Sequence, residues 1–425
     1  MTNLSKKLNK EYLLKESKYF CMAPWVHMHM WPNGEAFPCC IVLADKNQKG
    51  MGNFNESTIK ELWNSDSMRK FRLNAIKDKP TQMCHRCYDL EETGNVWTLR
   101  KNLNKDFAEK FDRVNDTEQD GSHDDPQFYY WDIRFNNLCN MKCRTCGPEF
   151  STSWWKELVQ LGNEKYKDPN KIISLSKKPT FWEEITPLVS NIESVYFAGG
   201  EPLITDEHYT MLDIWLKTNK QDKIKISYTT NFSHLKHKGK NVLEYWKQFK
   251  NVDVVASLDG SYKRGEWIRK GTRWSKIVEN RKKMKQEIPD TMFGITPTVS
   301  AYNVWHLPDF FKEWAELGLI KPWNIRINLL TTPDFMQVQV LPEKFKKEVE
   351  EKWLEYLNWL VKQGYSEEDN HWMFNMKRGV IKYLWREDLS HMIPKLISRS
   401  TQLDKIRKES MWEIFPELEI LKQYA

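Results

Sequence analysis

The pattern of apolar and polar positions changes near residue 128. From there on, short apolar runs typical of strands alternate with amphipathic segments; the runs lie at residues 129–135, 192–198, 224–230, 252–258, 293–299 and 323–330. Between them apolar side chains recur at helical spacing, as at Leu307, Phe310, Phe311, Trp314 and Leu317. Strands that alternate with helices predict an α/β fold with a parallel sheet, either doubly wound or a partial (β/α)6 barrel. In both, loops at the carboxyl ends of the strands build the site.

Two further segments divide the chain. The polar run at residues 115–127 predicts a linker. From Leu341 the sequence predicts a charged amphipathic helix with Trp353, Leu354, Leu357 and Leu360 on one face, and more helical sequence follows to Ala425. We interpret this helical C-terminal extension as a packing cap; a substrate-binding lid is the alternative. The expected domains are therefore residues 1–125, 126–335 and 336–425.

Composition excludes several classes of protein. The chain has 425 residues, of which 40% are hydrophobic and 29% charged, so a sizeable core can form. No apolar stretch has the length of a membrane span, and the lysine-rich N-terminus lacks the apolar segment of a secretory signal. The formal net charge of +7 comes from mixed basic and acidic residues, which argues against nucleic acid as a partner. We expect a cytoplasmic protein with reduced cysteines and no membrane contact.

Three of the cysteines follow the first predicted strand at a Cys-x3-Cys-x2-Cys spacing: Cys139, Cys143 and Cys146. Thiolates suit iron–sulfur clusters and zinc. A structural zinc ion takes a fourth protein ligand, and this loop supplies none. A four-iron cluster held by three thiolates keeps one iron open for another ligand. The spacing by itself leaves the cluster, zinc and an incidental grouping as alternatives.

Polar motifs end the next three predicted strands. Gly199, Gly200, Glu201 and Pro202 follow the second strand, Asn231 follows the third, and Ser257 and Asp259 lie at the end of the fourth. Paired glycines let the backbone approach a ligand, and a glutamate accepts hydrogen bonds from an ammonium group. Ser257 and Asp259 could hold ribose hydroxyls. Each motif alone also suits a simple turn; together, at consecutive strand ends, they predict a site.

With these motifs, residues 129–330 resemble the radical S-adenosylmethionine (SAM) superfamily. The resemblance implies a 4Fe-4S cluster on Cys139, Cys143 and Cys146 whose open iron binds SAM. It also implies that Gly199, Gly200, Glu201 and Pro202 recognise the methionine amino group, that Ser257 and Asp259 lie near the ribose, and that Asn231, Ser300 and Asn303 contact SAM. One departure is Thr145, where many members have an aromatic residue before the third cysteine.

The remaining cysteines lie in the N-terminal part. Cys21 and Cys39 flank a hairpin-like segment with Asn33-Gly34 as its turn, and Cys84 and Cys87 form a Cys-x2-Cys pair. Two cysteines from the hairpin-like segment and two from the Cys-x2-Cys pair give a four-thiolate site. In this site Cys40 is either not a ligand or replaces Cys39. The residues alone do not separate zinc from an iron–sulfur cluster.

This segment resembles the SPASM module, or its shorter twitch form, which holds auxiliary clusters. The resemblance rests on Cys21-x12-Gly34-x4-Cys39, the segment at residues 52–72 and Cys84-x2-Cys87. It implies a second 4Fe-4S cluster on Cys21, Cys39, Cys84 and Cys87. The order is unusual, because this module commonly follows the radical SAM core. Nearby, His27 and His29 alternate and should face one side of a strand; a structural pair is one interpretation and substrate contact the other.

The resemblances imply a radical SAM enzyme. It would cleave SAM to a 5′-deoxyadenosyl radical and abstract hydrogen from a peptide or protein side chain, with the auxiliary cluster as electron acceptor and a flavodoxin or ferredoxin-type protein as electron donor. One alternative is a small-molecule radical dehydrogenase acting on a polyol or sugar-like substrate. The alternative of another class is a non-catalytic iron–sulfur or zinc protein. Asp132, Glu201 and Asp259 lie near the expected cavity mouth, but the sequence does not identify a general base.

Overall fold

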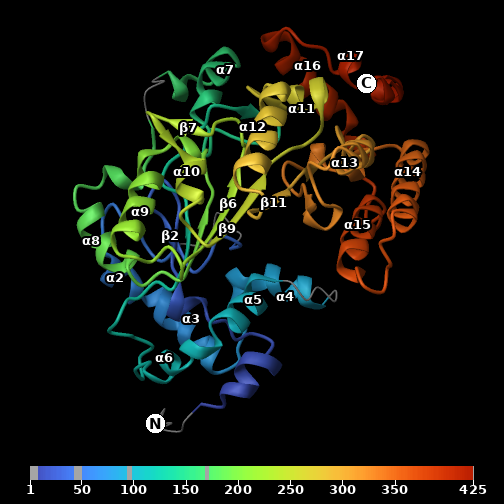
Figure 1. Ribbon diagram of the computed structural model, residues 1–425. Coiled ribbons are helices and arrows are strands. Elements are labelled where there is room, and N and C mark those ends of the chain that lie inside the picture. Colours follow the sequence, from blue (N-terminus) through green and yellow to red (C-terminus); the bar gives the residue numbers. More distant parts are fainter. Residues whose placement is uncertain (1–7, 43–49, 93–97, 168–171, 425) are drawn as a thin grey trace. The chain divides into compact units, whose positions relative to one another are not determined.

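The computed structural model describes residues 8–42, 50–92, 98–167 and 172–424. The chain forms two compact units, each built from several segments. Figure 1 shows the helices and strands, coloured along the sequence. The first unit comprises residues 1–137, 172–227 and 249–251, and the second comprises residues 138–171, 228–248 and 252–425. These units are defined by contacts, and the expected domain boundaries after residues 125 and 335 stay a prediction.

In the described part of the chain, four strands lie wholly within the first unit, together with the helices that pack on them. The strands are β1 (His29–Met30), β2 (Ala36–Phe37), β3 (Tyr130–Ile133) and β5 (Ser194–Phe197). The helices are α1 (Ala23–Val26), α2 (Ile59–Trp63), α3 (Asp66–Ile76), α4 (His85–Glu92), α5 (Leu99–Asp106), α6 (Asp112–Asn115), α8 (Phe181–Val189) and α9 (Asp206–Lys217).

Strand pairing in this unit is mainly parallel. β3 pairs with β5 in parallel, with Tyr130 opposite Ser194, and β1 pairs with β3 in parallel at Met30 and Ile133. β1 and β2 form an antiparallel hairpin. The N-terminal cysteine-rich segment therefore adds its own hairpin to the sheet, beside the first predicted strand.

Phe197 illustrates how the apolar face of this sheet is covered. Its ring packs against Phe135 and against Trp215 of α9, and Phe135 in turn packs against Phe181 of α8. All four side chains are nearly or fully buried. The burial of these aromatic groups holds α8 and α9 on one face of the sheet, and the opposite face carries polar side chains.

The second unit contains the remaining strands and helices. The strands are β4 (Lys142–Cys143), β7 (Lys236–His237), β8 (Lys240–Asn241), β10 (Arg269–Lys270), β11 (Met292–Ile295), β12 (Thr298–Val299) and β13 (Asn328–Leu329). β6 (Lys225–Thr230) and β9 (Asn251–Ala256) begin with residues of the first unit and end with residues of the second. The helices are α7 (Trp155–Gln160), α10 (Val242–Trp246), α11 (Tyr262–Ile268), α12 (Trp274–Glu287), α13 (Leu307–Glu316), α14 (Glu343–Lys362), α15 (His371–Leu384), α16 (Ile393–Arg407) and α17 (Met411–Ile414).

The predicted strand–helix alternation is confirmed, and so is the α/β fold with a parallel sheet. β9 and β11 pair in parallel with Asp253 opposite Met292, and β12 pairs in parallel with β13. Two predicted strands differ in detail. Residues 293–299 form β11 and β12 rather than one strand, because Pro297 between them has no backbone N–H to donate. The run at 323–330 begins in a 3-10 turn at Pro322–Asn324, so only β13 remains as a strand.

Helices α13, α14 and α15 pack together in the second unit (Figure 1). In α13, four of the five residues of the predicted apolar stripe are buried, and Leu317 is 60% exposed just beyond the helix end. In α14, Trp353, Leu357 and Leu360 are buried as predicted, but Leu354 is 44% exposed. The buried face of α14 is therefore narrower than the sequence pattern indicates.

The polar run at residues 115–127 is fixed by side chains from the first unit. The Trp25 indole N–H donates to the Thr117 hydroxyl at 2.8 Å, and Arg72 Nη1 donates to the Gly121 carbonyl at 3.2 Å. Arg69 also pairs with Asp120 at 2.7 Å. This segment is thus a well-anchored part of the unit that contains the N-terminal hairpin.

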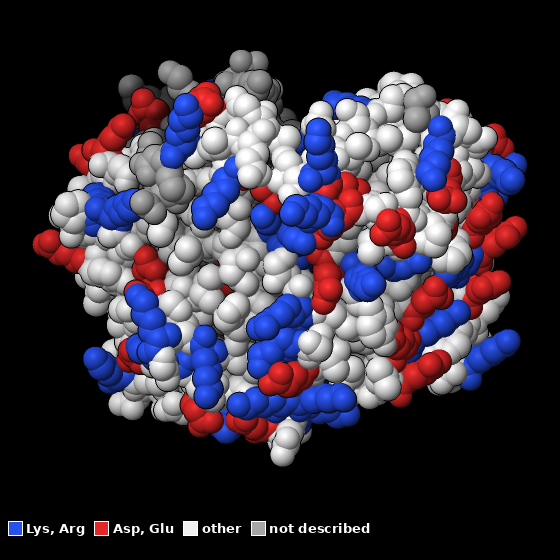
Figure 2. Space-filling view, turned by 90° about the horizontal axis from the view of Figure 1, so that it is seen from above, with Lys and Arg blue, Asp and Glu red and all other residues white. Residues whose placement is uncertain are grey.

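No helix in the described part of the chain is long and apolar enough to cross a membrane. On the face shown in Figure 2, basic and acidic side chains are interspersed. This distribution agrees with the mixed charge pattern of the sequence.

Candidate iron–sulfur sites

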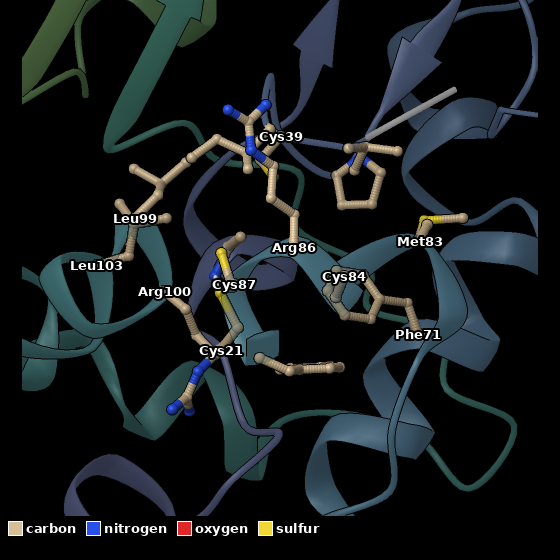
Figure 3. Close-up of a pocket in the computed structure, with 15 residues that line it drawn as sticks. Cys21, Cys39, Phe71, Met83, Cys84, Arg86, Cys87, Leu99, Arg100 and Leu103 are labelled. Carbon is tan, nitrogen blue, oxygen red and sulfur yellow. Dashed lines mark hydrogen bonds between the residues drawn. The ribbon is translucent and has the colours of Figure 1, made fainter. Parts of the chain in front are cut away.

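Four cysteines of the first unit surround one space, which is also lined by apolar side chains and two arginines (Figure 3). They are Cys21, Cys39, Cys84 and Cys87. Protein atoms leave about 420 Å³ unfilled there, including the open side. The segment before α1, the end of the hairpin, and the 3-10 turn and first turn of α4 thus bring together the cysteines that the sequence assigned to one site.

The local sequence explains how the cysteines reach this position. Cys39 follows β2, and the hairpin before it turns at Gly34, which has a φ of +90°. A Cβ atom at Gly34 would lie 2.2 Å from Asn53 Oδ1, so only glycine fits. Cys84 ends a 3-10 turn (Gln82–Cys84), and Cys87 lies in the first turn of α4. Because Cys84 and Cys87 are three residues apart, both thiols lie at the start of this helix.

Each of the four sulfurs has a hydrogen-bond donor beside it. Backbone N–H groups of Ala23, Ile41 and Arg100 face Cys21, Cys39 and Cys87 respectively, and the Tyr88 hydroxyl faces Cys84. Such donors stabilise negative charge on cluster-bound sulfur. Arg100 adds a buried positive charge, which is also paired with Glu91.

Burial raises the pKa of Cys21 to about 12, and it also raises the pKa values of Cys39, Cys84 and Cys87. The neutral thiols are therefore favoured in the absence of a metal, and binding of an iron–sulfur cluster would release protons. A set of four thiols without histidine or carboxylate ligands fits an iron–sulfur cluster.

Cys40 does not line this space. Its side chain contacts Asp132 of β3, and Arg134 is close to it. Cys39, by contrast, faces Cys84 and Cys21. Cys39 therefore lines the space and Cys40 does not; the assignment of Cys39 as the cluster ligand stays a prediction.

The second candidate site lies in the second unit. Cys139, Cys143 and Cys146 lie in the loop after β3, and Cys143 belongs to β4, which pairs antiparallel with β10. This pairing places Arg269 opposite Cys143, with Arg269 Nη1 3.8 Å from Cys143 Sγ. Burial raises the pKa of Cys143, and the Arg269 guanidinium opposes that shift. Burial also raises the pKa of Cys146 to about 12.

Asn231 lies beside the same loop. Its Nδ2 atom is 3.9 Å from Cys139 Sγ and donates to Asn140 Oδ1 at 2.9 Å. Ser257 follows β9, and its backbone N–H donates to the carbonyl of Thr230 at the end of β6. The ends of β6 and β9 therefore lie side by side in this unit, as the sequence predicted.

Asp259 is fully buried and pairs with Arg269, with Oδ2 2.8 Å from Arg269 Nε. Asn303 holds the same loop, because its Nδ2 donates to the Asp259 carbonyl at 3.0 Å. Ser300 donates its N–H to Asn303 Oδ1 at 2.8 Å. Hydrogen bonds thus link Ser300 and Asn303 to the backbone of Asp259. The Asp259 side chain in turn orients Arg269 toward Cys143. Their contacts with SAM stay a prediction.

Arg269 and Arg144 are site residues that sequence reasoning missed. Arg269 reaches the cysteine loop only through the pairing of two strands of two residues each, which leaves almost no hydrophobic pattern to detect. Arg144 lies between two cysteines but points away, toward Trp267 and α16. The signal that the sequence offered was a basic residue between two cysteines of the same loop.

The glycine-rich motif lies in the first unit. Gly199 has a φ of +113°, and a Cβ atom there would lie 3.0 Å from the Arg134 Cβ atom. Glu201 is buried and accepts the Leu203 N–H at 3.1 Å, which caps a 3-10 turn beginning at Pro202. Gly200 donates to the Asn136 carbonyl. The role of these residues toward SAM stays a prediction.

Within the described residues, no group of three or more histidine, cysteine, aspartate or glutamate side chains is spaced to hold a single metal ion.

Residues 21–88 match the SPASM family model. Its description is an iron-sulfur cluster-binding domain. The match covers the hairpin, the first half of α4 and all four cysteines that line the space, and it confirms the predicted SPASM-type module and an iron–sulfur cluster as its cofactor. No curated protein matches the chain.

Solved structures show a weak likeness. For anSMEcpe with bound AdoMet, the identity is 19% over 55% of this chain and 60% of that chain, with a TM-score of 0.38. For Streptococcus suis SuiB bound to S-adenosylmethionine, the identity is 14% over 80% of this chain and 68% of that chain, with a TM-score of 0.34. SuiB bound to the precursor peptide SuiA matches at 14% identity over 69% of this chain and 60% of that chain, with a TM-score of 0.28. This chain therefore spans only about 60% of the anSMEcpe chain.

Proposed function

We propose that the chain is a radical SAM enzyme with one auxiliary cluster. The observation that carries the proposal is the arrangement around the three-cysteine loop. Cys139, Cys143 and Cys146 share one unit with Asn231 and with the Asp259–Arg269 pair, at the ends of neighbouring strands. When bound there, a 4Fe-4S cluster with SAM on its open iron would supply a 5′-deoxyadenosyl radical that abstracts hydrogen from the substrate.

The chain's own residues have separable roles in this proposal. The three thiolates hold the cluster, and Arg269 offsets negative charge on Cys143. Asn231 donates toward Cys139 Sγ and fixes the loop through Asn140. Asp259 keeps Arg269 oriented through its ion pair, and Asn303 fixes the backbone of Asp259.

We further propose that the cluster on Cys21, Cys39, Cys84 and Cys87 accepts an electron from the substrate. The four thiols leave no iron open to substrate, which favours electron transfer over substrate binding. A flavodoxin or ferredoxin-type donor would deliver the electron that SAM cleavage requires. The mildly positive net charge of +7 suits such acidic proteins.

For the substrate we propose a peptide or protein side chain, with a polyol or sugar-like molecule as the second candidate. Peptide-bound structures exist among the weakly similar proteins, namely anSMEcpe with the Cp18Cys peptide and SuiB with SuiA. The two candidates differ in the assay, because an extended peptide should protect a larger part of the chain from proteolysis than a polyol.

The experiment that tests the function is anaerobic. The protein is reconstituted with iron and sulfide, and 5′-deoxyadenosine is measured after addition of dithionite and SAM. A Cys139/Cys143/Cys146→Ala triple variant serves as the control, since it keeps the auxiliary cysteines. Product that disappears in the triple variant supports the proposal. Folded, iron-loaded protein that neither binds SAM nor forms product favours the non-catalytic alternative.

A further inference from the structure

β1, β3 and the residues that flank them carry a group of buried polar side chains that the proposals above do not use. We call His27, His29, Asp132 and Arg134 the polar cluster. All four belong to the first unit, and His27, His29 and Asp132 have no exposed surface. Buried groups of this kind normally have hydrogen-bond partners.

The backbone of β3 fixes the tautomer of both imidazoles. His27 Nδ1 lies 3.1 Å from the Tyr130 carbonyl oxygen, and His29 Nδ1 lies 3.2 Å from the Asp132 carbonyl oxygen. A carbonyl can only accept, so each Nδ1 carries the proton and each Nε2 is an acceptor. Burial lowers the pKa of His27 to about 3 and that of His29 to about 4, which keeps both rings neutral.

These acceptors have few donors. Among the described residues, His27 Nε2 and His29 Nε2 are buried without a hydrogen-bond partner. The buried Asp132 carboxylate is faced by the Cys40 thiol, but no nitrogen or oxygen donor of the described residues makes a hydrogen bond to its oxygens. The nearest cationic atom is Arg134 Nε, which is 3.5 Å from Asp132 Oδ1 and also lacks a hydrogen bond. The polar cluster therefore lacks hydrogen-bond donors far more than it lacks acceptors. A species that donates hydrogen bonds would satisfy it.

The charge of the polar cluster restricts what that species can be. Arg134 compensates Asp132, and this ion pair with the neighbouring histidines lowers the pKa of the Asp132 carboxyl against the opposing effect of burial. With both imidazoles neutral, the four side chains carry no net charge. A charged ligand would lose its hydration on burial and would find no unpaired counter-charge in the polar cluster. The desolvation of an uncharged donor costs far less free energy.

The position of the polar cluster ties it to the auxiliary site. Cys40 contacts Asp132, and its neighbour Cys39 lines the auxiliary cavity. Cys40, Tyr130 and Arg134 are partly exposed, and the Arg134 guanidinium lies over the Trp31 ring at 4.9 Å.

We propose that the polar cluster is a binding site for an uncharged hydrogen-bond-donating group of the substrate, an amide N–H or a hydroxyl. His27 Nε2, His29 Nε2 and the Asp132 carboxylate accept from that group, and Arg134 donates to an acceptor on the same group. The assignment of this ligand as substrate rests on the proposed function. The binding itself requires neither SAM nor a reductant, so the two can fail separately.

The test uses the reconstituted full chain and four small probes. Acetamide offers N–H groups, N,N-dimethylacetamide lacks them, and methylammonium and acetate are charged. Ligand-observed NMR titrations give the dissociation constants. We expect acetamide to bind at least about tenfold more tightly than each of the other probes, because only it supplies a neutral donor. A crystal soaked with acetamide should place its nitrogen within hydrogen-bonding distance of two of the acceptors.

A His27→Phe/His29→Phe double variant should lose the preference for acetamide, since it removes two acceptors but keeps aromatic volume. Should this variant fail to fold by circular dichroism, Asp132→Asn provides the second test, because its own amide N–H groups can fill the acceptors. His208→Phe, which removes another buried imidazole of the same unit, is the matched control and should keep the preference. Equal binding of the two amides, tighter binding of a charged probe, or an ordered water that acetamide does not displace would each overturn the proposal.

Discussion

Arg144 and Asp404 form a buried ion pair, with Arg144 Nη2 2.5 Å from Asp404 Oδ1. Arg144 lies inside the three-cysteine loop, and Asp404 lies in α16 of the C-terminal extension. The Arg144 guanidinium also stacks on Trp267 at 3.3 Å, and Trp267 donates its indole N–H to Asp404. The C-terminal extension therefore holds the cysteine loop in place.

We expect Asp404→Ala to destabilise the second unit by about 3 kcal/mol, because it leaves the Arg144 charge buried with less compensation. Chemical denaturation monitored by tryptophan fluorescence measures this. Asp334→Ala is the control, since its pair with Lys395 is exposed and spans 3.8 Å; it should cost less than about 1 kcal/mol. Equal effects of the two substitutions would contradict the conclusion that the buried Arg144–Asp404 pair holds the cysteine loop in place.

The two adjacent cysteines of the hairpin should differ in iron binding. Cys39→Ala is expected to lose about half of the iron of the reconstituted protein, because one of two clusters lacks a ligand. Cys40→Ala should keep all of it, since Cys40 contacts Asp132 instead. Iron and sulfide analysis with electron paramagnetic resonance measures both. Loss of the auxiliary signal in Cys40→Ala would assign the ligand to Cys40.

Gly34→Ala should disrupt the hairpin that carries Cys39. The residue has a φ of +90°, and an added Cβ atom would lie 2.2 Å from Asn53 Oδ1. We expect a loss of at least about 2 kcal/mol, from left-handed strain together with the clash. Gly364→Ala is matched in φ, at +87°, and has open space around it, so it should cost only about 1 kcal/mol. Thermal unfolding and the iron content report the difference.

Lys377 should make stability depend on pH. It is fully buried, its Nζ atom lies 3.4 Å from the Pro322 carbonyl oxygen, and burial lowers its pKa to about 7. The unfolded chain then binds more protons than the folded chain from about pH 7 to about pH 10.4, so stability rises with pH across this window. From pH 7 to pH 9 the expected gain is about 2 kcal/mol.

Lys377→Met should remove this rise and be more stable than the native chain at pH 7. Lys395→Met, at an exposed position, should keep the rise. Unfolding at both pH values checks the prediction, and an unchanged slope in Lys377→Met would refute it.

The elements that sequence predicted well are those with a long periodic pattern or a fixed spacing. The strand–helix alternation, the hairpin at Asn33-Gly34 and the meeting of Cys21, Cys39, Cys84 and Cys87 are of this kind. Arg269 could not be placed, because the strand pairing that brings it to Cys143 involves very few residues. The ion pair of Arg144 joins it to Asp404, 260 residues away in the chain, and no local pattern encodes such a contact.

Cys39 and Cys40 are joined by a single peptide bond, yet one lines the auxiliary cavity and the other reaches Asp132. Insertion or deletion of one residue between Gly34 and Cys39 would exchange which thiol faces which side. The register of the hairpin therefore decides which of the two thiols lines the auxiliary cavity and which contacts the polar cluster. For this division of roles, the register matters more than the identity of either residue. Changes in the length of the segment between Gly34 and Cys39 should be far less tolerated than conservative substitutions within it.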